Sequence, residues 1–471
     1  MITGPLDTSD EPAVAQVNSP KTDKSLHTQN DGPISDHCDV VVIGGGPAGS
    51  SVASLLAKER EIEVVLLEKV KHPRPTVGES LIPHFWKFAD HTGVAEKVEQ
   101  EGFIRKAGGI TVWEGRIHQF SFANFGYKRP ALHVERDRFD QILLQHAIDC
   151  NAQVFEKVIV KSVDFSDPLK LTVYYSDRRG DSDYPGRITC KYVVDASGVS
   201  TVLAKQFNTR KLISSERKFL SMWGYYKNAR YVGADGKSYG PESLPAVKPV
   251  TFVLSYRDGW VWHIILRQST SVGLVIGTDR VKGMGKKAQE EYFLKTCAQI
   301  PYLKDLLQPA TFMEGSLYFR PDYSYYSTKL CGENFYSVGD AGAFVDPIFS
   351  HGVQAAFYNA AVCAWAIQAS LSNAGKRAVY SKICEEKMQQ YYGFSRSLAL
   401  GDFGDEGVNP DLVKSLMKSM PPIELEMMLV ASDISNRSSN FLRMANEAGV
   451  LGKYGEGFTS DKARILSELN I

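Results

Sequence analysis

Three glycines in the spacing G-x-G-x-x-G are the first feature of the chain that could do chemistry. Gly44, Gly46 and Gly49 follow the β-branched run 38–43, and Glu68 comes 24 residues after the first glycine. In this pattern the first glycine permits a tight turn, the second lets backbone N–H groups approach a pyrophosphate, and the third allows close helix–strand packing. The following helix would direct its N-terminus at the phosphates. The segment predicts a dinucleotide site, and an acid at position 68 disfavours the 2′-phosphate of NADP.

Two later strand ends and one helix start indicate which dinucleotide binds. Asp195 ends the strand-like run 192–195, Asp340 follows a second such run, and Arg136 opens an R-x-x-F-D sequence. These motifs are similar to those of the flavoprotein hydroxylase superfamily, in which the second aspartate binds the ribityl chain of the flavin and the arginine lies near the FAD. Turn formation after a strand is the alternative for both aspartates. The resemblance implies FAD, held by Gly44, Gly46, Pro47, Ala48, Gly49, Glu68, Arg136, Asp195, Gly339 and Asp340.

Within that superfamily, the segment 75–87 narrows the chemistry. It holds a Gly-Glu-Ser loop, a proline and, four residues later, Lys87. The segment resembles the GE-[S/A]-x-x-P loop of the flavin-dependent halogenases, and the resemblance implies that Lys87 is catalytic. Aromatic neighbours and a place in the first turn of a helix would both favour its neutral, nucleophilic amine. The alternative is an ordinary solvated surface lysine.

Two tryptophans form the second distinguishing motif. Trp260 and Trp262 lie two apart in a predicted strand and therefore share one face, as an aromatic wall. The pattern resembles the W-x-W-x-I-P motif of the halogenases, although Ile265 stands where the proline is expected. By the resemblance, this wall separates substrate from flavin. Two core tryptophans in a sheet are the alternative.

The run 344–352 is the third motif. It matches the halogenase signature F-x-x-P-x-x-S-x-G at Phe344, Pro347, Ser350 and Gly352. An alanine-rich helix is predicted to begin near 353, so backbone N–H groups at 350–352 would form an anion site at its N-terminus. The resemblance implies that Ser350 and Gly352 bind chloride or bromide. The same donors could instead serve the carbonyl oxygens of the flavin ring.

Together these motifs imply an enzyme that uses FADH2, O2 and chloride or bromide to make hypohalous acid, which the active-site lysine passes to an aromatic ring. Phe349 stands where the tryptophan halogenases carry a glutamate. Without that carboxylate the substrate must supply its own activation, which favours the phenol and pyrrole branch and a phenolic natural product, free or on a carrier protein. A separate flavin reductase would be the partner. A single-component NADPH-dependent aromatic hydroxylase and a non-halogenating flavoprotein of the same fold are the alternatives.

The elements that must position these residues indicate an α/β protein. We expect a glutathione-reductase-like FAD-binding Rossmann domain (36–205 and 325–375) interleaved with an antiparallel-sheet substrate region (206–324). A flexible leader (1–35) would precede it and a helical C-terminal region (376–471) would follow. Strands at 250–256, 260–267 and 272–278 would form a meander in the substrate region.

Composition excludes several other classes. Lys+Arg and Asp+Glu both total 54, so there is no basic excess of the kind that nucleic-acid binding requires. The seven cysteines contain no C-x-x-C pair, which argues against a zinc site or a disulfide framework. The apolar run 353–371 suits a buried helix better than a membrane span. We therefore expect a cytoplasmic enzyme with no metal, no nucleic-acid partner and no membrane association.

Overall fold

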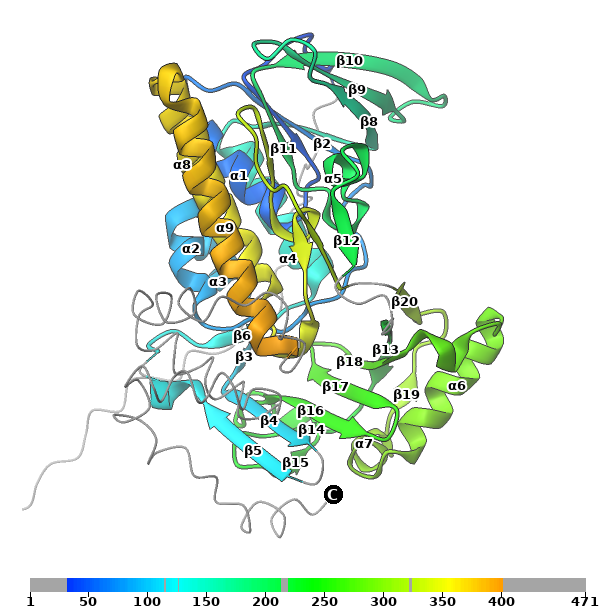
Figure 1. Ribbon diagram of the computed structural model, residues 1–471. Coiled ribbons are helices and arrows are strands. Elements are labelled where there is room, and N and C mark those ends of the chain that lie inside the picture. Colours follow the sequence, from blue (N-terminus) through cyan, green and yellow to red (C-terminus); the bar gives the residue numbers. More distant parts are fainter. Residues whose placement is uncertain (1–31, 114–115, 126, 213–218, 322–323, 401–471) are drawn as a thin grey trace, which may run out of the picture.

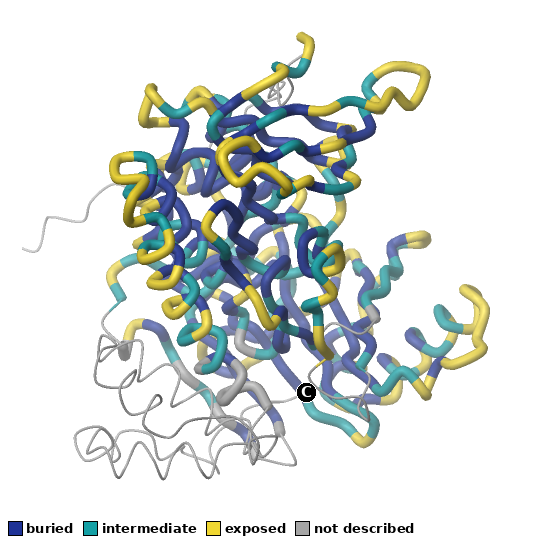
Figure 2. The backbone as a smooth tube through the Cα atoms, turned by 45° about the horizontal axis from the view of Figure 1, so that its top comes forward, coloured by how far each residue is buried: buried dark blue, intermediate teal, exposed yellow. Residues whose placement is uncertain are grey.

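The computed structural model describes residues 32–113, 116–125, 127–212, 219–321 and 324–400. Two sheets organise this part of the chain, one drawn at the top of Figure 1 and one at the bottom. The strands of both sheets are largely buried, and exposure is concentrated in loops and on outer helix faces (Figure 2).

The upper sheet is parallel, with strand order β22-β11-β1-β2-β7. Its strands are Phe335–Ser337, Tyr192–Asp195, Val40–Ile43, Val64–Glu68 and Gln153–Glu156. Strand β1 is buried on both faces, as its lack of alternation predicts. Val40 and Val42 pack toward the helices, whereas Val41 and Ile43 pack toward a second sheet. The helices are α1 (Pro47–Ala57), α4 (Arg136–Asp149) and α8 (Gly352–Ser372), and the second sheet is β8 (Val158–Asp164), β9 (Leu171–Asp177) and β10 (Tyr184–Cys190).

The lower sheet has the order β19-β13-β18-β17-β16-β4-β5, with β20 also paired to β13. The predicted meander is present as β16 (Val250–Tyr256), β17 (Gly259–Ile265) and β18 (Thr270–Gly277). The other strands are β4 (Gly108–Trp113), β5 (Arg116–Ser121), β13 (Phe219–Lys227), β19 (Thr311–Phe312) and β20 (Tyr318–Pro321). Helices α6 (Lys286–Gln299) and α7 (Pro301–Leu307) cover one face through Phe293 and Leu303. Strands β4 and β5 join this sheet from within the range expected for the FAD-binding domain.

Three smaller sheets and four further α-helices complete the described part of the chain. Strand β3 (Ile104–Lys106) pairs with β6 (Ala131–His133), and β12 (Arg210–Leu212) pairs with β21 (Tyr325–Ser327), which pairs with β23 (Ala343–Phe344). A further hairpin is formed by β14 (Tyr231–Val232) and β15 (Ser238–Tyr239). The remaining helices are α2 (Phe85–Thr92), α3 (Ala95–Gln100), α5 (Val202–Gln206) and α9 (Arg377–Leu400).

Helix α8 confirms the prediction of a buried helix after residue 352, and it packs between α1 and α9 (Figure 1). Among the residues that the structure describes, no helix is long and apolar enough to cross a membrane. The predicted leader, apart from 32–35, and the helical region beyond 400 lie outside the described residues.

Candidate active site

The glycine loop between β1 and α1 has the turn and the packing that its spacing predicts. Gly44 has φ +105°, and a Cβ atom there would lie 2.4 Å from the carbonyl oxygen of Ala196. A Cβ atom on Gly49 would lie 1.9 Å from the carbonyl oxygen of Gly44. Neither position can accept a side chain without moving the backbone, so both glycines are required by the geometry.

Glu68 and an arginine complete this end of the site. The Glu68 carboxylate accepts hydrogen bonds from the backbone N–H groups of Gly45 (2.6 Å) and Val70 (2.9 Å). Arg74, which the sequence analysis did not single out, lies over Gly46, with Nη2 3.4 Å from where a Cβ atom would be. It is also 3.6 Å from Asp140. An arginine here supplies the positive charge that a pyrophosphate needs.

Arg136 holds the adjoining loop in place. Its guanidinium group is paired with Asp140 (2.9 Å) and donates to the carbonyl oxygen of Val77 (2.7 Å). Burial disfavours the charge, but the Asp140 carboxylate outweighs burial and raises the pKa of Arg136. The group therefore remains a cation at the wall of the cavity described below.

The two aspartates that end parallel strands have different surroundings. The Asp195 carboxylate accepts from the N–H groups of Ser197 (3.0 Å) and Leu203 (2.7 Å), and Asp195 does not line the cavity. These bonds match the alternative interpretation, in which this residue forms the turn after its strand. Asp340 does line the cavity, and burial raises the pKa of its carboxyl group to about 6. A partly buried acceptor in that place fits a ribityl hydroxyl of FAD.

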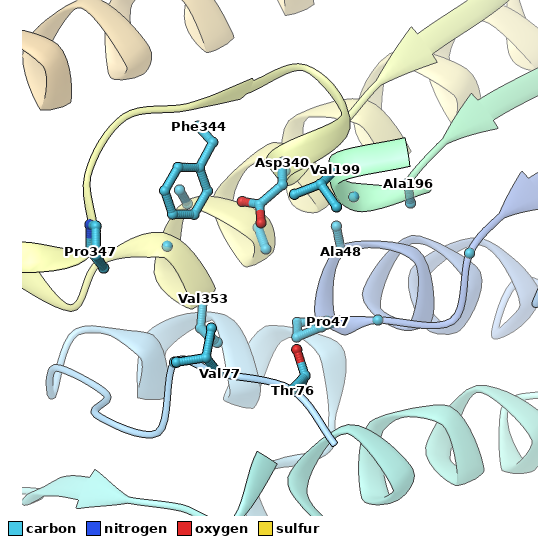
Figure 3. Close-up of a pocket in the computed structure, with 18 of the residues that line it drawn as sticks. Pro47, Ala48, Thr76, Val77, Ala196, Val199, Asp340, Phe344, Pro347 and Val353 are labelled. Carbon is cyan, nitrogen blue, oxygen red and sulfur yellow. The ribbon is translucent and has the colours of Figure 1, made fainter. Parts of the chain in front are cut away.

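One cavity of about 520 Å³ connects most of the predicted residues, and this volume is typical of ligand pockets. It extends from the glycine loop past Glu68, Arg74 and Arg136 to the tryptophans and the 344–352 run. Figure 3 shows its middle, where Asp340 and Phe344 face the glycine-loop residues Pro47 and Ala48 across the cavity. The residues present therefore fit FAD.

Trp260 and Trp262 both line this cavity and are buried. Their ring centroids are 5.9 Å apart, so they form the single aromatic wall that their spacing predicts. The Trp262 indole N–H donates to the Ser271 hydroxyl (3.2 Å). Ile265, at the expected proline, ends β17, and its carbonyl oxygen accepts a hydrogen bond from a histidine described below.

The 344–352 run lies across the cavity from the glycine loop, at the N-terminus of α8 (Figure 3). Phe344, Pro347, Ser350 and Gly352 all line the cavity. Ser350 has φ +56°, and its backbone N–H already donates to the carbonyl oxygen of Pro347 (3.1 Å). Gly352 is the first residue of α8, and within the described residues no heavy atom beyond its chain neighbours and its own helix lies within 4 Å of where its Cβ atom would be. Phe349 belongs to the short helix 347–349, and its side chain lies outside the described part of the structure.

Lys87 lies apart from these residues. Its side chain is exposed on α2, with Nζ 5.9 Å from the centroid of the Phe88 ring, and it does not line the cavity. Phe85 and Trp86 are buried, so the aromatic run packs inward while the lysine points outward. The buried surroundings that would favour a neutral amine are therefore absent at this position, although Lys87 does lie in the first turn of α2 as expected.

A different lysine has those surroundings. Lys106, at the end of β3, is only 3% exposed, and burial lowers the pKa of its amine to about 7. Its Nζ donates to the hydroxyl groups of Ser80 (2.5 Å) and Thr251 (3.0 Å), and both of these residues line the cavity. Nothing in the local sequence Phe-Ile-Arg-Lys-Ala-Gly-Gly distinguishes Lys106 from a surface lysine. Only tertiary packing against β16 and the 78–80 loop buries it.

The fold and the cavity define an FAD-binding flavoprotein of the oxidoreductase class. The family described as "FAD binding domain" matches residues 37–231. The chain is 33% identical over 338 residues to tryptophan 2-halogenase of Chondromyces crocatus, covering 71% of this chain and 61% of that protein. It is 33% identical to flavin-dependent halogenase armH3 of Armillaria mellea, covering 71% of this chain and 68% of the relative. The chain belongs to the flavin-dependent halogenases.

A solved structure supports the same family and fold. The myxobacterial chondrochloren halogenase CndH superposes with a TM-score of 0.68 at 28% identity, covering 92% of this chain and 93% of that chain. The matched region spans only 61% of the tryptophan 2-halogenase and 64% of a further relative, flavin-dependent halogenase armH5 of Armillaria mellea.

Proposed function

We propose that this protein is an FADH2-dependent halogenase that uses O2 and chloride or bromide to halogenate an electron-rich, phenolic substrate. The observation that carries the proposal is the buried Lys106 amine, whose two hydroxyl partners line the same cavity as the FAD-binding loop. A hydroxylase that transfers oxygen directly from flavin to substrate has no use for such an amine. Bound FAD, when reduced, would supply two of the four electrons that reduce O2, and the halide would supply the other two as it becomes hypohalous acid and water is released.

The chain's own residues would bind and separate the reactants. Arg74 and the N-terminus of α1 would hold the pyrophosphate, and Asp340 would accept from the ribityl chain. We propose that halide binds beside Gly352 at the start of α8, where the open position and the helix dipole favour an anion. Trp260 and Trp262 would keep the substrate away from the flavin.

We propose Lys106, rather than Lys87, as the lysine that transfers the halogen. A neutral amine can attack hypohalous acid, forming an N–halogen bond and releasing water; the aromatic ring then takes the halogen and the amine is restored. Alternatively the protonated amine polarises hypohalous acid through a hydrogen bond. The first route needs an amine that is partly neutral near pH 7, which burial provides at Lys106. Lys87 is the natural control because it is exposed.

A phenol is the substrate class that we propose, either free or attached to a carrier protein. The position of the glutamate in tryptophan halogenases is Phe349 here, so the ring must activate itself. One relative is named a tryptophan 2-halogenase, which makes indoles the competing class. A separate flavin reductase would supply FADH2.

The test supplies a flavin reductase, FAD, O2 and either chloride or bromide, with a panel of phenols and tryptophan as substrates. We expect halogenated phenols, identified by their isotope doublets in mass spectrometry, and little conversion of tryptophan. Efficient halogenation of tryptophan would overturn the substrate class. Hydroxylated products that form equally well without halide would overturn the halogenase proposal and favour the aromatic hydroxylase.

A further inference from the structure

A chain of four polar side chains extends from Lys106 into the protein. Besides the two bonds from Lys106, the hydroxyl oxygens of Ser80 and Thr251 lie 2.9 Å apart. His133 Nε2 is 2.9 Å from Thr251 Oγ1, and His133 Nδ1 is 3.0 Å from the carbonyl oxygen of Ile265. All four side chains belong to buried residues. They come from the 78–80 loop, the β3–β6 pair and β16, so the network connects the Gly-Glu-Ser loop to the lower sheet.

The direction of each hydrogen bond in this network follows from the bond at Ile265. A carbonyl oxygen only accepts, so Nδ1 of His133 must carry a proton. Burial and the neighbouring Lys106 charge lower the pKa of His133 well below its usual value, so the ring is neutral and Nε2 has a lone pair. The Thr251 hydroxyl therefore donates its single proton to His133.

This assignment determines what Lys106 must do. Because the Thr251 proton is committed to His133, the Thr251 oxygen can only accept from Ser80 and Lys106. The Ser80 hydroxyl then donates to Thr251 and accepts from Lys106. A neutral Lys106 amine has two hydrogens, and both are directed to these hydroxyl oxygens. Its lone pair must point away from Ser80 and Thr251.

Charged groups do not compete for this orientation. Glu79, the carboxylate next to Ser80 in the sequence, is bonded to the Tyr225 hydroxyl (2.9 Å) and to the N–H of Gly78 (3.0 Å). Within the described part of the chain, no carboxylate pairs with Lys106, and its nearest aromatic contact is the Phe122 ring, with Nζ 5.4 Å from the centroid. The Ser80 and Thr251 hydroxyl groups are thus the main contacts that orient the Lys106 amine.

We infer that His133 is a positioning residue for halogen transfer, which through Thr251 and Ser80 sets the orientation of the Lys106 amine. This inference rests on the proposed function. It also gives a physical role to Ile265, since its carbonyl oxygen selects the His133 tautomer. The serine of the Gly-Glu-Ser loop acquires a function as the second acceptor for the amine.

The first test is independent of activity. In 15N-histidine-labelled protein loaded with FAD, NMR should report His133 as the neutral Nδ1–H tautomer at pH 7, with assignment by a His133→Asn variant. An Nε2–H tautomer, or a charged ring, would reverse the bonds at Thr251 and overturn the inference. This result stands whether or not the protein halogenates the substrates offered.

The second test measures halogenated product per reduced flavin oxidised. Thr251→Val keeps the side-chain shape but removes the hydroxyl group, and should lower this ratio roughly 10- to 100-fold, as expected for a misplaced reactive group. Thr251→Ser restores the hydroxyl and should recover most of the ratio. FAD binding and the rate of flavin oxidation should be unchanged, which excludes a general folding defect.

The third test asks whether the residues act through one path. His133→Asn keeps a donor for Ile265 but lacks the Nε2 acceptor, so it should resemble Thr251→Val. The double variant should be no worse than either single variant, because both break the same connection. Losses that add in the double variant, or a wild-type ratio of halogenated product to oxidised flavin in Thr251→Val, would overturn the positioning role of His133. Wild-type protein that makes no halogenated product would instead refute the proposed function, and the tautomer would still decide the network.

Discussion

Replacing Lys106 with methionine should stabilise the folded protein at neutral pH while abolishing its chemistry. In the unfolded chain this amine is charged below its ordinary pKa of 10.5, whereas burial lowers its pKa in the fold to about 7. Keeping the amine buried at pH 7 therefore costs on the order of 4 kcal/mol of folding free energy. Methionine is unbranched and apolar and fills a similar space without that cost.

Part of this gain is lost again, because Ser80 and Thr251 lose a donor. Each lost hydrogen bond costs about 1 kcal/mol, so the net stabilisation of Lys106→Met at pH 7 should be roughly 2 kcal/mol. The sign of the pH dependence follows from proton counts. Between pH 7 and 10.5 the unfolded wild-type chain binds more protons than the folded protein, so wild-type stability rises with pH. The advantage of the variant should shrink across this range, disappear at about pH 9 and reverse above it.

The assay is urea unfolding at several pH values, with saturating FAD and with FAD affinity measured separately for each protein, so that ligand binding contributes equally. Lys87→Met is the matched control, because an exposed lysine should change stability by no more than about 0.5 kcal/mol at any pH. A Lys106→Met variant that is less stable than wild type at pH 7, or a difference that ignores pH, would refute the argument that Lys106 is buried against its charge.

Three further outcomes test the site. Gly49→Ala should abolish FAD binding or destabilise the fold by about 1–3 kcal/mol, because its Cβ atom would strike the Gly44 carbonyl oxygen. The control is Gly352→Ala, whose Cβ atom has open space and which should fold and bind FAD normally. Isothermal titration with FAD distinguishes the two variants. FAD affinity should rise with pH through about 6 as Asp340 ionises, and Asp340→Asn should bind FAD more weakly and without this pH dependence, measured by fluorescence quenching. Lys87→Met should halogenate at the wild-type rate, and loss of product in this variant would return the catalytic role to Lys87.

Much of the fold could be predicted from local sequence. Buried β-branched runs, a glycine loop and a helix follow one another in the order that a Rossmann unit requires, and the meander is marked by its turn at 257–259. The membership of β4 and β5 in the lower sheet could not be predicted. Strand β4 pairs in parallel with β16, about 140 residues later, and no local pattern encodes so distant a partner.

The residues of the site likewise separate into those whose positions local spacing predicts and those whose positions depend on tertiary packing. Gly44, Gly49 and the two tryptophans have positions that spacing alone specifies, and the structure has them as predicted. The aromatic neighbours and the loop motif of Lys87 favour it from sequence, and Lys106 was not considered, because nothing in its local sequence marks it as buried. Their difference is the packing of loop 78–80, β3 and β16 around one of them. Arg74 was missed for the same reason, since it reaches the glycine loop only through the fold.

A single-turnover experiment tests the central claim most directly. Protein loaded with reduced FAD is mixed with O2, bromide and a phenol, and the product is examined by mass spectrometry. A brominated phenol with its isotope doublet is expected from the wild type, and none from Lys106→Met, although both proteins reoxidise flavin at similar rates. A product that carries oxygen in place of bromine, formed equally well without halide, would contradict the account.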